Sequence, residues 1–184
     1  PAAGDLGLPL PPKGPATTAL ETLGTMLDTQ PSPHPAIEYG LGWLREHLPE
    51  KEEVVLVHGD FRTGNFLVTP DGLSAVLDWE FSHWGSPYED LAWISVRDWR
   101  FGQLDQPIGG FAKRAPFYDA YCNASGRTLE PEQLLFWEVF GNLRWAVGSA
   151  AQGERYLTGG EKDLELIAIA RRAVEMEFEA LRLM

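Results

Sequence analysis

The middle of the chain changes its hydrophobic period, and this change most constrains the fold. Three short runs there are rich in β-branched and aliphatic residues and are bounded by turn-forming residues, as strands are. These runs are 54–57, 66–69 and 73–77. Between the last two, Thr69-Pro70-Asp71-Gly72 places proline where the first turn torsion is preset and glycine where a positive torsion is tolerated. We therefore expect the last two runs to form a β-hairpin.

Helical patterns flank these strands. Apolar residues recur every three or four positions, and clusters of proline or glycine separate the segments. Ser86 and Glu89 around Pro87 form a capping-box pattern, which predicts that one helix begins there. A small strand cluster accompanied by several helices predicts an α+β fold. The other expected helices cover 18–27, 35–48, 108–123, 131–152 and 161–183.

The beginning of the chain differs in composition from the rest. Its first 15 residues contain five prolines and three glycines, a mixture that neither continues a helix nor donates regularly to a sheet. We expect an arm or linker over 1–17 and one lobe over 18–184. Within the lobe, 54–90 would carry the chemistry and 91–184 the helices that bind a substrate.

The charge balance limits the partners of this chain. Fifteen Lys and Arg residues stand against 27 Asp and Glu residues, a net charge of -12. A nucleic-acid partner is not expected, because phosphate contacts need clustered basic side chains. The acidity would help to attract a cationic substrate, although a well-solvated surface has the same composition.

The sequence gives no sign of a membrane or an oxidising compartment. Cys122 is the only cysteine, so an internal disulfide is excluded. No apolar run approaches the roughly 18 residues of a membrane span, and no signal-peptide pattern is present. We expect a cytoplasmic protein, and its oligomeric state stays open.

Polar residues are dense around the predicted strands. The segment 58–65, His-Gly-Asp-Phe-Arg-Thr-Gly-Asn, follows the first strand, and Asp78-Trp79-Glu80 follows the last. Asp60, Asn65, Asp78 and Glu80 can therefore converge at the strand ends. Carboxylate and amide oxygens suit Mg²⁺, and a cation would relieve the repulsion among the carboxylates.

These motifs resemble a known family. His-Gly-Asp, an asparagine five residues after the aspartate, a strand pair and Asp-Trp-Glu are similar to aminoglycoside phosphotransferases and related small-molecule kinases, including choline kinases, which share the protein-kinase fold. The motifs cover about 35 residues, and the helices behind them are compatible with the C-terminal lobe of the family. Downstream segments resemble bacterial phosphotransferase-family proteins and the kinase-like domains fused to acyl-CoA dehydrogenases.

The resemblance implies roles for individual residues. Asp60 would be the catalytic base that accepts the proton of a substrate hydroxyl as it attacks the γ-phosphoryl group of ATP. Arg62 would touch the transferred phosphate. Asn65 and Asp78 would hold Mg²⁺, and Glu80 would support the metal shell. His58 would orient the loop, and Asp90 would accept hydrogen bonds from the loop backbone. These last two complete the implied site.

The same resemblance implies an N-terminal lobe with a glycine-rich loop and a strand lysine. Before His58 the only lysines are Lys13 and Lys51, and no such strand pattern accompanies them. We therefore expect this chain to hold the C-terminal catalytic lobe without the nucleotide-binding lobe, and to be inactive alone. The residues that bind the nucleotide base are unknown.

Alternatives to this interpretation stay open. The chain could be a kinase-like binding module without catalysis, or a metal-dependent phosphoesterase that uses water as the nucleophile. The acceptor could be an aminoglycoside, a hydroxyacyl compound or another small hydroxyl compound. We interpret Trp93, Trp99, Trp137 and Trp145 as packing residues rather than as a platform for substrate stacking.

Overall fold

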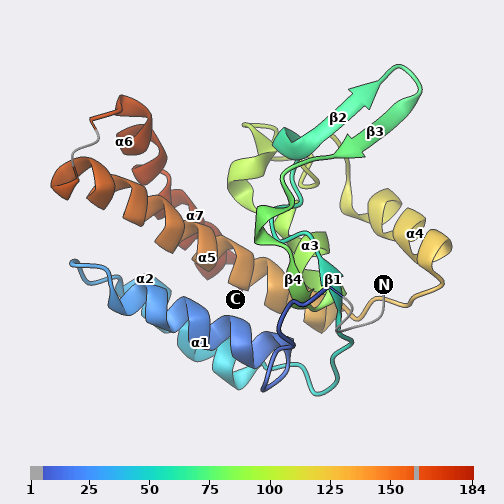
Figure 1. Cartoon of the computed structure of the whole chain (residues 1–184), viewed down its shortest axis with the longest axis horizontal. Coiled ribbons are helices and arrows are strands. Elements are labelled where there is room, and N and C mark those ends of the chain that lie inside the picture. Colours follow the sequence, from blue (N-terminus) through green and yellow to red (C-terminus); the bar gives the residue numbers. More distant parts are fainter. Residues whose placement is uncertain (1–5, 160–161) are drawn as a thin grey trace.

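The fold is organised around one long helix, as the computed structural model shows (Figure 1). The structure describes residues 6–159 and 162–184. The long helix α5 (Pro131–Thr158) crosses the molecule, and helices from both ends of the chain pack along it. The other helices are α1 (Pro15–Asp28), α2 (Pro35–Glu46), α3 (Pro87–Trp93), α4 (Arg114–Ser125), α6 (Leu164–Ala170) and α7 (Ala173–Leu183).

In the residues that the structure describes, the strands form two separate antiparallel pairs. They are β1 (Val55–Val57), β2 (Phe66–Thr69), β3 (Gly72–Val76) and β4 (His83–Gly85). The predicted hairpin is present, because β2 pairs with β3 across the turn at Pro70 and projects from the helical body (Figure 1). Strand β1 pairs with β4. Neither β4 nor this pairing was predicted from the sequence. Three short 3₁₀ turns, η1 (Thr63–Asn65), η2 (Trp79–Phe81) and η3 (Arg97–Arg100), lie between these elements.

The predicted helices are present, but one begins earlier than predicted, one begins later, and one is divided in two. Helix α1 begins at Pro15, three residues before the predicted start. The helix predicted from Ile108 starts at Arg114, because Gly109 and Gly110 adopt positive φ and close a turn instead. The pattern over 161–183 is broken into α6 and α7, and Arg172 at the break pairs with Asp98. Residue 161 lies outside the described residues.

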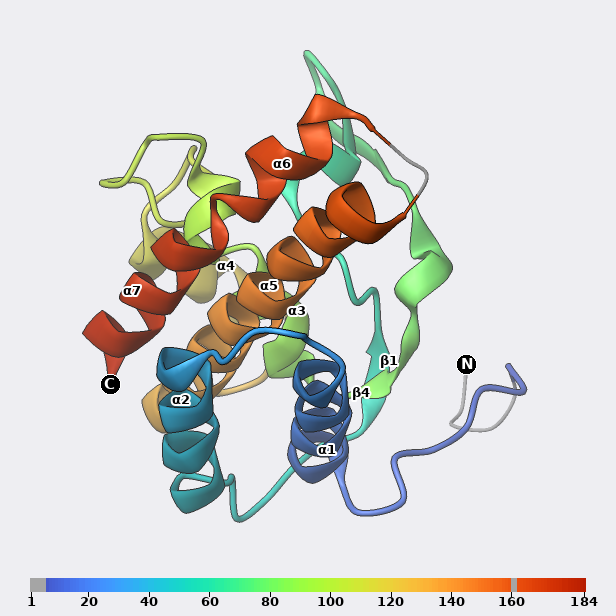
Figure 2. The ribbon, with the colours of Figure 1, turned by 90° about the vertical axis from the view of Figure 1, so that its left-hand side faces the viewer.

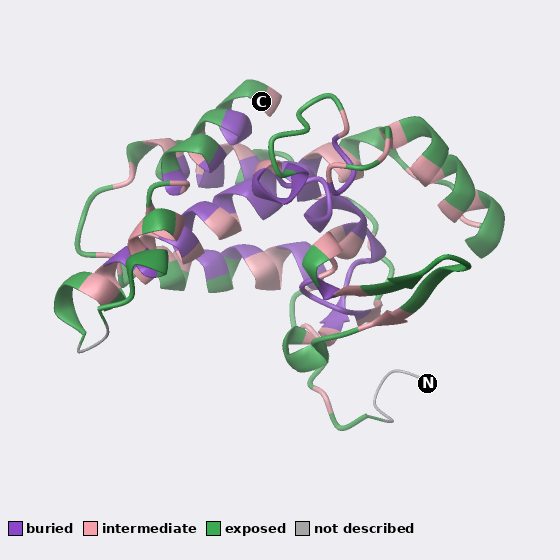
Figure 3. Ribbon diagram, turned by 90° about the horizontal axis from the view of Figure 1, so that it is seen from above, coloured by how far each residue is buried: buried purple, intermediate pink, exposed green. Residues whose placement is uncertain are grey.

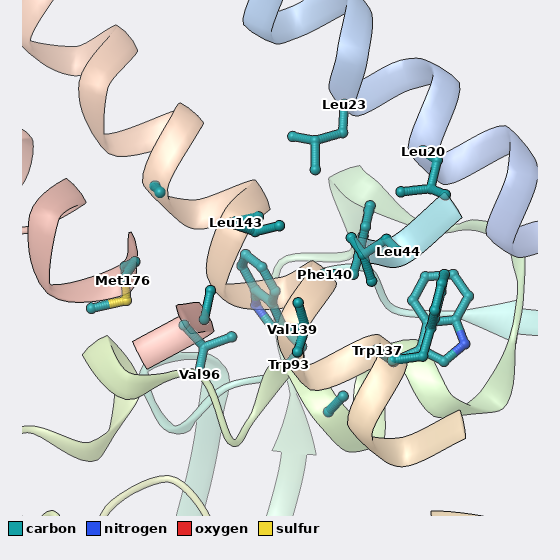
Figure 4. Close-up of a cluster of buried hydrophobic side chains, with 14 of the residues drawn as sticks. Leu20, Leu23, Leu44, Trp93, Val96, Trp137, Val139, Phe140, Leu143 and Met176 are labelled. Atoms are coloured by element: carbon teal, nitrogen blue, oxygen red, sulfur yellow. The ribbon is translucent and has the colours of Figure 1, made fainter. Parts of the chain in front are cut away.

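The core lies where α5 meets α1, α2, α3 and α7. Helices α1 and α2 lie side by side against α5 (Figures 1 and 2). Burial concentrates along the middle of α5 and on α3, whereas the β2–β3 hairpin is exposed (Figure 3). The buried side chains that meet in this core include Leu20, Leu23, Leu44, Trp93, Val96, Trp137, Val139, Phe140, Leu143 and Met176 (Figure 4). Burying such aliphatic and aromatic side chains is the main stabilising term in a fold of this size.

A buried charge network joins η3, α5 and α7. Glu179 of α7 is fully buried, and its carboxylate lies 3.0 Å from Arg100 and 2.8 Å from Arg182. Arg100 is also buried and lies 3.2 Å from Glu138 of α5. Burial alone would raise the pKa of Glu179, but the hydrogen bond from Arg182 and the charge of Arg100 outweigh it and lower the pKa to about 2.

Replacing Glu179 should therefore destabilise the protein. Glu179→Gln leaves Arg100 and Arg182 without this charge partner, and removing one partner of a buried ion pair costs about 3 kcal/mol. Because the pKa of Glu179 is about 2 in the folded state against an ordinary value of 4.5, its contribution is present above that ordinary value and is lost as the pH falls toward 2.

Urea unfolding at neutral and acid pH measures this effect. The difference in unfolding free energy between wild type and Glu179→Gln should be largest at neutral pH and should become smaller at acid pH. Glu46→Gln at the exposed end of α2 is the matched control. Equal unfolding free energies for all three proteins at neutral pH would contradict the role of the buried network.

Candidate active site

A tight loop follows β1 and carries the first candidate residues. Gly59 has a φ of 81°, in the left-handed region that favours glycine. A Cβ atom at this position would clash with the carbonyl oxygen of Phe81, so the loop passes directly against η2. The close passage brings Asp60 and the segment after β3 to the same place.

Asp90 of α3 holds this loop from behind. Its carboxylate accepts hydrogen bonds from the backbone N–H groups of His58 at 2.7 Å and Gly59 at 3.0 Å. Burial raises the pKa of Asp90, and the two N–H donors act against this shift. The helix that carries Asp90 begins with the predicted capping box, in which the Ser86 N–H donates to the Glu89 carboxylate at 2.7 Å.

His58 joins the loop to the end of the hairpin. Its Nδ1 accepts the Asp60 backbone N–H at 3.1 Å, which places the ring proton on Nε2. Nε2 then donates to the Leu77 carbonyl at 2.8 Å. The imidazole thus spans the two segments that carry Asp60 and Asp78, and both of its nitrogens are engaged in that link.

The Asp60 carboxylate is buried and held on both oxygens. Trp93 Nε1 donates to Oδ1 at 2.7 Å, and Asn65 Nδ2 donates to Oδ2 at 2.8 Å. Arg62 Nε lies 3.2 Å from Oδ1 and 3.1 Å from Oδ2. These donors fix the orientation of the carboxylate.

Asp78 and Glu80 lie across from Asp60. Asp78 has a φ of 67°, so it is in the left-handed conformation although it is not glycine, and Glu80 follows in η2. Both side chains are exposed. In the part of the chain that the structure describes, neither carboxylate forms a hydrogen bond or an ion pair.

One cavity brings the candidate residues together. It has a volume of about 330 Å³. Asp60, Arg62, Asp78 and Glu80 all line it, so three of the four residues expected to converge at the strand ends, Asp60, Asp78 and Glu80, share this cavity. Asn65 lies directly behind Asp60, whereas His58 and Asp90 support the loop and do not line the cavity. The remaining lining residues are Met26, Phe81, Trp93, Trp99, Arg144, Trp145 and Gly148.

The donor set suits a magnesium ion that shares its shell with a phosphate. Asn65 donates through Nδ2, and in the described residues its Oδ1 accepts no hydrogen bond, so this oxygen is available together with the free carboxylates of Asp78 and Glu80. Mg²⁺ prefers such oxygens and commonly keeps only one or two carboxylates from the protein. Within residues 6–159 and 162–184, no three His, Cys, Asp or Glu side chains cluster closely enough to form a metal site by themselves.

Several residues of the site could not be found from the sequence. Arg144 and Trp145 come from α5, and Arg144 reaches the loop 85 residues away by donating to the Gly59 carbonyl at 3.1 Å. Trp93, Trp99 and Trp145 pack together, as predicted, but they also line the cavity. Trp137 lies wholly in the core.

Comparison with a family model places this arrangement among known proteins. The model of the "Phosphotransferase enzyme family" matches residues 11–135, which include the loop, the hairpin and η2. Acyl-CoA dehydrogenase family member 11 of Rattus norvegicus is 42% identical over an alignment of 139 residues that covers 68% of this chain and 18% of that protein. Both findings confirm the resemblance seen in the motifs.

Solved structures show the same fold. A Ralstonia eutropha protein assigned as an aminoglycoside phosphotransferase is 23% identical and has a TM-score of 0.81, over 99% of this chain and 58% of that one. A choline/ethanolamine kinase family protein from Mesorhizobium loti is 19% identical, with a TM-score of 0.63 over 92% and 53% of the two chains. The fold is thus kinase-like and mainly helical, and the chain spans just over half the length of these two proteins.

The helices themselves bear on membrane insertion. In residues 6–159 and 162–184, no helix combines the length and apolar composition that crossing a bilayer requires.

The loop contacts predict a stability effect at Asp90. Asp90→Ala leaves the N–H groups of His58 and Gly59 without their acceptor, and a buried donor without a partner costs about 1–3 kcal/mol. We expect the unfolding free energy to fall by about 3 kcal/mol. Chemical denaturation measures it, with Asp119→Ala on the exposed side of α4 as the control. A loss no larger than that of the control would show that Asp90 does not hold the loop.

Proposed function

This chain belongs to the phosphotransferase enzyme family, and we propose that it is the catalytic lobe of a kinase that transfers the γ-phosphoryl group of ATP to a hydroxyl group of a small molecule with the help of Mg²⁺. The observation that carries this proposal is the setting of Asp60. Its carboxylate is buried, and Asp90 holds its loop in place through two hydrogen bonds. It lines the same cavity as Asp78 and Glu80, whose carboxylates have no partner among the described residues.

Asp60 acts as the base in this proposal. The donors from Trp93, Asn65 and Arg62 fix both of its oxygens, so the carboxylate is oriented before an acceptor arrives. Phosphoryl transfer depends mainly on positioning and on neutralising phosphate charge. Asp60 therefore contributes directly to the reaction of the acceptor, because its oriented carboxylate receives the proton of the acceptor hydroxyl.

Asn65, Asp78 and Glu80 supply the oxygens for Mg²⁺. A bound Mg²⁺ would neutralise phosphate charge at this position. The Asn65 amide can contact both Asp60 and the metal, because its nitrogen donates to Asp60 while its oxygen is available to a cation. This double role ties the position of the metal shell to that of the base.

Arg62 connects the base with the phosphate. Its Nε lies within 3.2 Å of both Asp60 oxygens, and it lines the cavity. When its guanidinium turns toward the transferred group, it frees the base for the acceptor and brings a positive charge to the phosphate. Arginine suits this role because its planar donors match phosphate oxygens.

Replacing the base should remove the activity. Asp60→Asn keeps the size of the side chain but cannot accept a proton, and general base catalysis contributes typically 10²–10⁴-fold. In the full-length protein, we expect phosphoryl transfer to a hydroxyl acceptor, found by ATP-consumption screening, to fall at least about 100-fold while Mg·ATP binding changes little. Asp71→Asn in the exposed hairpin turn is the control, and a mutant as active as that control sinks the assignment.

The metal assignment has its own test. Asp78→Asn removes one charged ligand, so the Mg²⁺ concentration needed for half-maximal transfer should rise about tenfold or more. The measurement is a magnesium titration of transfer at saturating ATP. An unaltered titration would remove Asp78 from the metal shell.

The same assays separate the alternatives. Phosphate release from a model ester without ATP would favour a metal-dependent phosphoesterase. ATP and ligand binding by the full-length protein with no transfer to any hydroxyl compound would favour a binding module without catalysis.

A further inference from the structure

Three indoles form one wall of the cavity beside Asp60. Trp93, Trp99 and Trp145, here called the indole wall, come from α3, η3 and α5. The ring centroids of Trp93 and Trp99 are 5.7 Å apart, and those of Trp99 and Trp145 are 4.8 Å apart. Under the proposed function, on which this inference rests, the hydroxyl acceptor must lie against this wall to reach the base.

The protein's own arginines already lie on the indole wall. Arg62 Cζ is 4.8 Å from the centroid of Trp99, and Arg144 Cζ is 4.6 Å from that of Trp93. Cationic ligands are recognised by open aromatic faces, over which they sit within about 6 Å. With guanidinium groups at those positions, the faces of Trp99 and Trp93 are already covered by the protein's own cations and are closed to a cationic acceptor.

Carboxylates that could bind a cationic acceptor are engaged elsewhere. Asp60 accepts hydrogen bonds from Trp93, Asn65 and Arg62. Asp98 behind the wall accepts the Trp145 Nε1–H at 2.6 Å and pairs with Arg172. The carboxylates of Asp78 and Glu80 belong to the proposed metal shell. With Mg²⁺ bound by Asp78 and Glu80, an ammonium group on the acceptor would therefore find no free counter-charge along the indole wall.

Arg144 has N–H donors at the indole wall that form no hydrogen bond among the described residues. In residues 6–159 and 162–184 it donates one hydrogen bond, from Nη1 to the Gly59 carbonyl, and its Nε and Nη2 groups donate none. The side chain is half-buried and lines the cavity. Burial lowers the pKa of Arg144, while the charges of Glu89, Asp60 and Asp90 raise it, and an arginine stays protonated in proteins.

We propose that Arg144 binds a carboxylate of the acceptor, so that the site takes hydroxyl compounds with a negative charge in preference to aminosugars or amino alcohols. The free Nε and Nη2 donors form the fork that binds a carboxylate in a bidentate manner. The Nη1 bond to Gly59 holds that fork beside the residue that precedes the base. One arginine thus recognises the acceptor and sets its distance from Asp60.

Three ligands that differ in one para substituent, which is anionic, neutral or cationic, test the proposal. They are para-(hydroxymethyl)benzoate, para-benzenedimethanol and para-(aminomethyl)benzyl alcohol, which share one flat ring and one hydroxymethyl group. Titration calorimetry on the full-length protein, with Mg²⁺ present and ATP absent, measures their binding. We expect the carboxylate to bind about tenfold more tightly than the diol, and the amine to bind most weakly.

Two variants assign the preference to Arg144. Arg144→Met should bind the carboxylate and the diol equally, and Arg144→Lys should keep part of the preference, because a lysine retains the charge but not the fork. Arg45→Met removes an exposed arginine of α2 that does not line the cavity, and it should leave the preference unchanged.

The outcomes are separable from those of the proposed function, since binding is measured without phosphoryl transfer. Equal affinities in the wild type, tighter binding of the amine, or no binding of the carboxylate at millimolar concentration would overturn the proposal. If Arg144→Met does not fold, the wild-type ranking and Arg144→Lys still decide it. A protein that prefers the carboxylate but never transfers phosphate would refute the proposed function alone.

Discussion

The two hydrogen bonds that Asp90 accepts from the loop are the contact on which the site depends. The start of α3 is fixed by local chemistry, because Ser86 and Glu89 satisfy each other's backbone N–H groups around Pro87. Asp90 in the first turn then fixes the backbone of His58 and Gly59, and the next residue is Asp60. The same helix ends at Trp93, whose indole N–H donates a hydrogen bond to the Asp60 carboxylate. A helix of two turns therefore positions both the backbone and the side chain of Asp60.

The parts of the site that could be predicted are those held by short-range chemistry. Asp60, Asn65 and Asp78 are bounded by a strand and a hairpin, so their convergence follows from turn residues that are visible in the sequence. Strand β4 was missed because its three residues carry no alternating pattern, and its pairing with β1 depends on contact between distant segments. Arg144 was missed because a helical period shows which face is buried but does not show what a side chain at the edge of that face will reach.

Net charge was a poor guide to the interior of the site. The sum of -12 comes largely from carboxylates spread over the surface, where water and salt screen them. At the indole wall, two guanidinium groups lie within 5 Å of ring centroids, and short distances in a partly buried cavity outweigh a diffuse surface charge. An acidic protein can therefore carry two guanidinium groups on one wall of its cavity.

The long helix explains how such a wall is kept in place. On α5, Leu143 and Val147 are fully buried in the core, and Arg144 and Trp145 lie between them in sequence. Because core packing tolerates little rotation, the helix cannot turn to relieve the charge of Arg144 without exposing Leu143. The guanidinium is held at the cavity by the burial of neighbouring residues on the same helix, so the apolar core supplies the free energy that keeps this cation beside Gly59.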